Sequence, residues 1–211
     1  MSNNMLGIAL RDVRGLLGNL MDKLCGADGE IWLEAFKKFL RKENPWVSPN
    51  FQTWKTIRLG TGLKTKANFL KAFKVARQRV CDDMVDMFVK PTFVVSGHEM
   101  EVELIKVTVE ELGFVGEVSL ENIYARAFDR GLILCPPEVG PQLRLQYKDQ
   151  PEDDWVIIAM EPIIDSHGVP CIFCMGLDVQ DGVALLGADR GNPEHTLLTG
   201  AQLVFLERKA A

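Results

Sequence analysis

Apolar residues at helical spacing mark the segment 30–42. They lie at i, i+3, i+4, i+7 and i+8, the spacing of one helix face: Trp32, Ala35, Phe36, Phe39 and Leu40. The pattern predicts a helix over these residues. Asn44-Pro45 ends it, because the residue before a proline is disfavoured in the helical conformation.

A second apolar series precedes this helix. Its members are separated by four and three residues in turn: Leu6, Leu10, Val13, Leu17, Leu20 and Leu24. This is the heptad spacing of the a and d positions in coiled coils. A helix this short needs a partner in water, so we expect it to pack either on its own domain or on a second copy of the chain.

A short strand and a long helix are predicted next. Residues 54–59 are expected to form a strand between irregular stretches that contain proline and glycine. Thr65 is a suitable N-cap for a helix over residues 66–88, and Pro91 ends that helix. Composition and charge change at the same point, so we expect a domain boundary near Lys90.

Residues 91–211 have the pattern of an α+β domain. Ser119 is expected to cap a helix that Gly131 ends, and Asp165–Gly168 to form a hairpin turn. Strands are predicted at residues 102–109, 132–135, 142–147, 155–160, 169–175 and 201–206. The predicted fold class is therefore α+β. A helical, basic region at 1–90 precedes a mixed domain in which a helix packs on an antiparallel sheet.

Charge divides the chain at the same place. Residues 1–90 hold 16 lysines and arginines against 9 acids, a net charge of +7, whereas residues 91–211 hold 8 against 20, a net charge of −12. The stretch from Lys37 to Arg79 contains 12 basic residues and one acid, Glu43. Such a stretch attracts polyanions through its field and through counterion release, unless acids of the same chain neutralise it. The candidate phosphate contacts are Lys37, Lys38, Arg41, Lys42, Lys55, Arg58, Lys64, Lys66, Lys71 and Lys74.

A second candidate site lies between Cys135 and Pro151. Glu138 is in a loop framed by proline and glycine, and the strand predicted at 142–147 presents alternate polar side chains on one face. In one interpretation Glu138 is an acid or base and Arg144 holds an anionic group. In the other, this is a solvated strand face with a surface ion pair. The residues assigned to the site are Glu138, Gln142, Arg144, Gln146 and Tyr147.

Five cysteines, an odd number, follow no recognisable signal peptide, which favours free thiols in the cytoplasm. His167, Cys171 and Cys174 have part of a metal-ligand spacing, but positions i and i+3 of a strand face opposite ways. Cys135 precedes two prolines and is expected in a loop, partly exposed. We predict no metal or cofactor, and no apolar run is long enough to cross a membrane.

Long motifs in this chain carry a resemblance to a known family. The principal one, over residues 134–151, reads LCPPEVGPQLRLQYKDQP. Others are Lys38–Trp46, Trp54–Thr65, Val109–Phe114, Ile123–Ala127, Trp155, Ile158–Ile163 and Val204–Phe205. On these motifs the chain resembles an uncharacterised protein family of candidate-phylum bacteria (Parcubacteria and relatives). That family often has alanine where this chain has Pro137. The resemblance implies no particular activity.

Three functions follow from these observations. The leading hypothesis is a cytoplasmic binding module, not an enzyme, that engages nucleic acid or another polyanion such as an acidic protein through the segment 37–79. The first alternative is a small-ligand binder or an enzyme centred on residues 138–147. The second alternative is a structural or assembly protein that self-associates through the heptad positions between Leu6 and Leu24.

Overall fold

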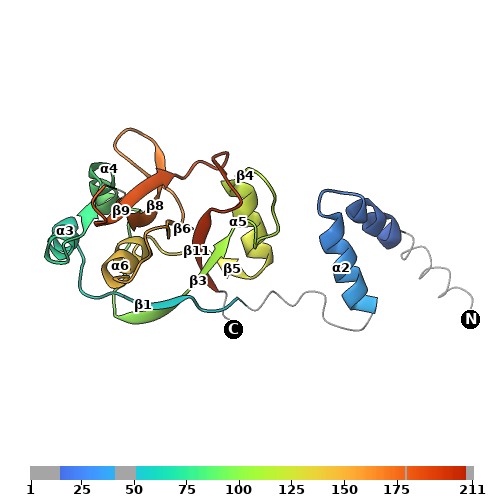
Figure 1. The fold of residues 1–211 in the computed structure, drawn as a ribbon, viewed down its shortest axis with the longest axis horizontal. Helices are drawn as coiled ribbons and strands as arrows, with labels where there is room; N and C mark the ends of the chain where they lie inside the picture. The colour runs from blue at the N-terminus through green and yellow to red at the C-terminus, as the bar shows by residue number, and fades with distance from the viewer. Residues whose placement is uncertain (1–14, 41–50, 179, 208–211) are drawn as a thin grey trace, which may run out of the picture. The chain divides into compact units, whose positions relative to one another are not determined.

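The chain divides between Asn50 and Phe51 into two units in the computed structural model (Figure 1). The structure describes residues 15–40, 51–178 and 180–207. We call the part up to Asn50 unit 1 and the part from Phe51 onward unit 2.

Unit 1 consists, in its described part, of two helices. Residues 15–24 are helical, and a turn leads into α2 (Gly29–Leu40). The helix predicted over 30–42 is thus confirmed as far as Leu40. Several residues named above lie outside the described part: Leu6, Leu10, Val13, Arg41 and Lys42.

Unit 2 holds four α-helices, one 3-10 helix and eleven strands in its described residues. The helices are α3 (Lys66–Val75), α4 (Asp82–Val85), η1 (Met87–Val89), α5 (Leu120–Asp129) and α6 (Val139–Gln146). The strands are β1 (Lys55–Leu59), β2 (Arg79–Val80), β3 (Met100–Thr108), β4 (Val118–Ser119), β5 (Leu132–Ile133), β6 (Val156–Ile158), β7 (Ile163–Ile164), β8 (Pro170–Leu177), β9 (Ala184–Arg190), β10 (Thr196–Leu197) and β11 (Gln202–Glu207).

Nine of these strands form one curled, mixed sheet. Its order is β1-β3-β11-β6-β8-β9-β2, with β5 paired to β11 and β7 paired to β8. Neighbouring strands run antiparallel except at β11/β6 and β2/β9, which are parallel. Strands β4 and β10 pair separately. The α+β class is confirmed, although the sheet is mixed rather than wholly antiparallel.

Local sequence signals correctly predicted where several helices begin or end. The Thr65 hydroxyl accepts a hydrogen bond from the Asn68 amide at the start of α3, and the Ser119 hydroxyl accepts one from the Asn122 amide at the start of α5. Gly131 follows α5 with a φ of 85°, a conformation that favours glycine. The hairpin turn predicted between β7 and β8 is also present.

The core of unit 2 lies between the sheet and its helices. Helix α6 packs against β1, β8, β9 and α3, whereas α5 packs against β4 and β5. Figure 1 shows α3 and α5 at opposite ends of unit 2. Five aromatic rings from α3, η1, the loop after it and β8 contact one another, with Phe88 stacked on Phe69 and on Phe173 and the other pairs edge-on or tilted: Phe69, Phe73, Phe88, Phe93 and Phe173.

The strand predicted at 142–147 is wrong, because this segment is the second half of α6. Alternation of Leu143, Leu145 and Tyr147 suggests a strand, but Val139, Leu143 and Tyr147 are also spaced i, i+4 and i+8. All three of these residues are buried. The segment adopts the helical period rather than the strand period, because the helix buries these three side chains against the sheet.

The long helix predicted over 66–88 is also wrong in its second half. Helix α3 ends at Val75, and Arg77 adopts a φ of 55°, which turns the chain out of the helix. Strand β2 then pairs in parallel with Leu185 and Leu186 of β9, and α4 and η1 follow. Pairing with a strand a hundred residues away outweighs the local helical pattern.

The boundary expected near Lys90 is corrected to the junction of Asn50 and Phe51. Strand β1 pairs with β3 over five residues, and β2 pairs with β9. The segment 51–90 therefore belongs to the same unit as the acidic segment that follows it. The change of charge along the sequence does not mark a change of unit.

Candidate nucleic-acid interface and the 138–147 segment

The basic residues of β1 are paired with acids of unit 2. Lys55 Nζ lies 3.3 Å from the Asp149 carboxylate and 4.1 Å from the centre of the Tyr147 ring. Arg58 lies 3.4 Å from Glu99 and 3.5 Å from Glu101 across the strand pair. These two cations of the predicted set are therefore largely neutralised.

In unit 1, Lys37 pairs with Glu34 at 2.6 Å, one turn earlier on α2. The side chain of Lys38 is outside the described part of the chain, as are Arg41 and Lys42. The structure therefore gives no arrangement for the basic end of this helix.

Helix α3 and its flanks carry the remaining cations. Phe69 and Phe73 bury one side of the helix, and the basic side chains project from the rest of it. We call the following set the α3 face: Lys64, Lys66, Lys71, Lys74 and Arg77. All are exposed except Lys66, which is half-buried, and none forms an ion pair with a described residue. No acid occurs between Gly60 and Cys81, so the α3 face has no neutralising group on its own segment.

Arg79 marks the limit of this face. Its guanidinium contacts Asp178 and Asp181, each at 2.5 Å, in the connection between β8 and β9. These carboxylates raise the pKa of Arg79 further, with Asp181 making the larger contribution. Among the described cations of the basic segment, the structure thus separates those paired with carboxylates from those of the α3 face, which have no ion-pair partner among the described residues.

Glu138 is completely buried and serves the fold. Its carboxylate accepts hydrogen bonds from the backbone N–H groups of Gly60 and Ser96, each at 2.8 Å, and from the Gln142 amide at 3.0 Å. Gly60 has a φ of 66°, and a Cβ atom there would lie 2.0 Å from the His98 carbonyl oxygen. Glycine at position 60 therefore lets the chain pass close to the His98 carbonyl while its N–H donates to the carboxylate.

Gln146 also binds the edge of the sheet. Its amide nitrogen donates to the Arg58 carbonyl at 2.8 Å, and its amide oxygen accepts from the Arg58 N–H at 2.9 Å. The Gln142 amide donates to the Thr61 hydroxyl at 2.7 Å. Gln146 of α6 thus satisfies both backbone groups of Arg58 in β1, the edge strand of the sheet, and Gln142 contacts the segment that follows β1.

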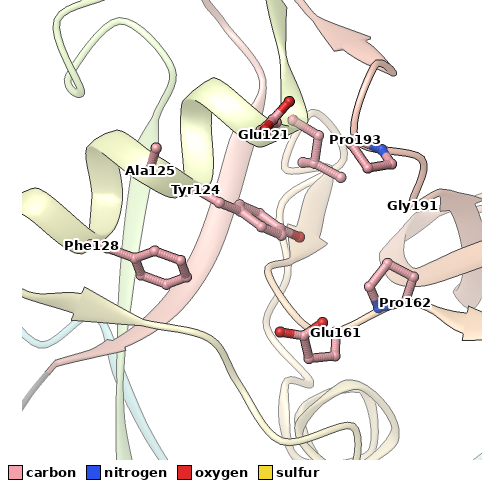
Figure 2. Close-up of a pocket in the computed structure, with 9 residues that line it drawn as sticks. Glu121, Tyr124, Ala125, Phe128, Glu161, Pro162, Gly191 and Pro193 are labelled. Atoms are coloured by element: carbon pink, nitrogen blue, oxygen red, sulfur yellow. The ribbon is translucent and has the colours of Figure 1, made fainter.

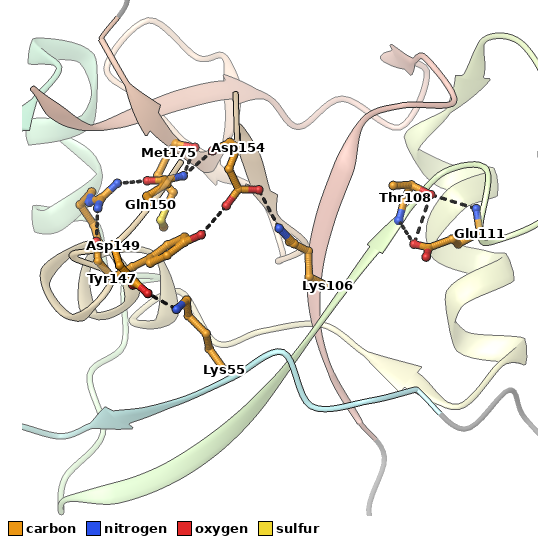
Figure 3. A network of polar contacts seen from close by, with 10 residues as sticks. Lys55, Lys106, Thr108, Glu111, Tyr147, Asp149, Gln150, Asp154 and Met175 are labelled. Carbon is orange, nitrogen blue, oxygen red and sulfur yellow. Dashed lines mark hydrogen bonds and ion pairs between the residues drawn. The ribbon is translucent and has the colours of Figure 1, made fainter. Parts of the chain in front are cut away.

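Arg144 is buried in a different network. Its guanidinium donates to the Gln150 side chain and to the Tyr147 carbonyl, and burial lowers the pKa of Arg144 to about 10. Gln150 in turn donates to the backbone carbonyls of Asp154 and Met175 (Figure 3). These partners all belong to the protein itself.

Tyr147 extends the network to the sheet. Its hydroxyl donates to the Asp154 carboxylate at 2.6 Å, and Lys106 of β3 contacts the same carboxylate at 2.6 Å (Figure 3). Burial and the Asp154 contact raise the pKa of the Tyr147 hydroxyl. Glu138 and Arg144 therefore meet different partners, and the structure does not join them in one acid–base and anion site.

The three buried cysteines, Cys135, Cys171 and Cys174, fit a structural role. Cys135 is buried, in contrast to the partly exposed loop position expected from sequence, because it pairs with Met160 beside β11. Burial raises the pKa of the Cys135 and Cys174 thiols, which disfavours the thiolate. None of the five cysteines forms a disulfide, and the described residues contain no group of three or more His, Cys, Asp and Glu side chains arranged for a metal ion.

A shallow hollow of about 350 Å³ lies elsewhere, beside α5 (Figure 2). Tyr124, Phe128 and Pro162 give it apolar walls, and the carboxylates of Glu121 and Glu161 lie at its rim. The Tyr124 hydroxyl is hydrogen-bonded to the backbone of Met160. Burial raises the pKa of this hydroxyl, so the hydroxyl is protonated at neutral pH. The sequence contains no motif that predicts this hollow. Its lining suits an apolar group and shares no residue with either predicted site.

Comparison of the chain with models of protein families, with curated proteins and with solved structures found no match. None of the helices in the described part of the chain is long and apolar enough to cross a membrane.

Proposed function

We propose that this protein binds the phosphate backbone of nucleic acid through the α3 face, without reading the base sequence. One observation carries the proposal. Cations elsewhere in unit 2, at Lys55, Arg58 and Arg79, meet carboxylates, whereas the α3 face keeps five cations without an ion-pair partner among the described residues.

The chemistry of this face suits phosphate contacts. Each phosphate that a lysine or arginine neutralises releases counterions, and log K falls with log salt by about 0.9 for each contact on duplex DNA. Five contacts would give a slope of about 4 to 5. The whole chain carries a net charge of −5, so we expect contact to be confined to this face.

The predicted alternative at residues 138–147 receives no such support. Glu138, Gln146 and Arg144 are each engaged by backbone or side-chain groups of the same unit. We assign no reaction to this segment. We place the binding activity in the cytoplasm, a location that the free thiols of the chain favour.

The test is fluorescence anisotropy with labelled single- and double-stranded DNA over a range of salt from about 20 to 200 mM. We expect binding that weakens steeply with salt. Replacing Lys64, Lys71 and Lys74 together by glutamine should lower the salt slope by about three and weaken binding equally for unrelated sequences.

The matched control replaces the paired cations Lys55 and Arg58 by glutamine. This change should alter the salt slope by much less than the α3-face variant does, because these side chains are already neutralised. No binding at about 20 mM salt would reject the proposal. Equal effects of the two variants would locate the interface elsewhere, and binding to acidic peptides but not to DNA would assign the face to a protein partner.

A further inference from the structure

Unit 1 exposes an unusual number of apolar side chains. Of the side chains described between residues 15 and 40, none is buried. The large apolar residues that stand open to solvent are Leu16, Leu17, Met21, Ile31, Leu33, Phe39 and Leu40. Single exposed apolar residues are common on protein surfaces, but a contiguous set marks an interaction site.

The apolar residues of α2 cover a wide arc of the helix, and both edges of that arc are exposed. Seven of its twelve residues are apolar, and at 100° per residue they span about 200° of the helix circumference. Trp32, Ala35 and Phe36 are half-buried within unit 1. Leu33 and Leu40, at one edge of the apolar arc, are 42% and 64% exposed. Ile31 at the opposite edge is 42% exposed, and Phe39 within the arc is 64% exposed. One neighbouring helix does not cover an arc of this width.

A pair of short helices without buried side chains has no core of its own. Isolated helices of this length are marginal in water, and their stability in proteins comes from packing of the apolar face. Leu33 and Leu40 are not covered within the described residues 15–40, so this edge of α2 is a candidate surface for a partner.

The charges of α2 indicate what that partner is. Glu30 and Glu34 lie in its first half, and Lys37 and Lys38 lie in its second half. A second α2 that runs antiparallel about an axis near Leu33 brings Glu30 of each copy opposite Lys37 of the other copy, and this Lys37 also pairs with Glu34 of its own helix. The antiparallel arrangement also opposes the two helix dipoles favourably.

We propose that unit 1 is a self-association element, in which α2 packs antiparallel on α2 of a second copy with Leu33 at the centre. The interface differs from the heptad series between Leu6 and Leu24 because it is centred on Leu33 of α2. In that series Leu20 and Leu24 are half-buried, whereas Leu17 is exposed. A two-fold contact of this kind is self-complementary and closes as a dimer. The inference does not depend on nucleic-acid binding.

Sedimentation velocity of the full chain provides the first test. We expect a species of about twice the 23.6 kDa chain mass at concentrations near 50 µM. The double variant Leu33→Asp with Leu40→Asp should sediment as a monomer and keep the thermal unfolding transition of unit 2. The control Val115→Asp changes a residue of unit 2 that is 94% exposed and should leave the dimer intact.

Disulfide cross-linking tests the register and does not require a disruptive substitution. Leu33→Cys, introduced together with Cys25→Ser to remove an exposed native thiol, should form a covalent dimer on mild oxidation. Val115→Cys in the same background should remain a monomer on a denaturing gel. A full chain that is monomeric near 50 µM, or a dimer that survives both aspartates, would overturn the proposal.

Discussion

At the scale of single residues, Glu138 and Gln146 show how α6 is used. The sheet has an edge at β1, and such an edge leaves a row of backbone groups unpaired. Gln146 binds both backbone groups of Arg58, and Glu138 accepts the N–H of Gly60. These two side chains supply the hydrogen bonds that a neighbouring strand would otherwise give.

Substitution of Glu138 by glutamine should destabilise unit 2 by about 1–3 kcal/mol. Glutamine keeps one oxygen for Gly60 and Gln142 but turns an amide N–H toward the N–H of Ser96, which loses its acceptor. Urea denaturation measures the change in the free energy of unfolding.

Glu99→Gln is the matched control for this variant. Glu99 is exposed and pairs with Arg58 on the surface, so its substitution should cost less than about 1 kcal/mol. Equal stability of the Glu138 variant and the control would show that the buried carboxylate does not hold β1.

At the scale of elements, α6 depends on close contact with β8. A Cβ atom on Gly140 would lie 2.6 Å from the ring of Phe173, which is itself buried between Phe88 and Phe93. The helix can approach the sheet at this point because position 140 has no side chain.

Gly140→Ala should therefore destabilise unit 2 by about 1–3 kcal/mol through overpacking, although alanine favours a helix by up to about 1 kcal/mol over glycine. Gly97→Ala is the control, because a Cβ atom there meets no atom within 4 Å. Thermal unfolding compares the two variants, and a Gly140 variant as stable as the control would contradict the close packing described.

Sequence patterns predicted elements well where the local signal was strong. The caps at Thr65 and Ser119 were predicted correctly, because a cap depends on residues within one turn. Helix α6 was not, since residues 142–147 alternate as in a strand while Val139, Leu143 and Tyr147 also have helical spacing. Glu138, Gln142 and Gln146 bind residues that lie 42 to 88 positions earlier in the chain, so no local pattern contains these partners.

At the scale of the whole molecule, the described core belongs to unit 2 alone. Every buried apolar residue lies between Ile57 and Phe205, and both the basic and the acidic parts of the sequence contribute to it. Unit 1 supplies exposed apolar side chains instead. We therefore assign the stability of the fold to unit 2 and self-association of the chain to unit 1.

Removal of residues 1–50 tests this division. The remaining chain should unfold cooperatively with a Tm within about 3 °C of that of the full chain, because no described core residue is lost. Differential scanning calorimetry measures the transition. A loss of cooperative unfolding would show that unit 1 forms part of the core.

The sequence by itself determined the fold class, the capped helices, the hairpin turn and the concentration of positive charge before residue 80. Each of these depends on composition or on neighbours within a few residues. Only the tertiary structure decided that residues 139–146 are helical, that residues 51–90 share a unit with the acidic segment, and which cations remain unpaired. Pairing between β1 and β3, and the acids that this pairing brings to Arg58, depends on residues more than 40 positions apart, and local periodicity carries no information at that distance.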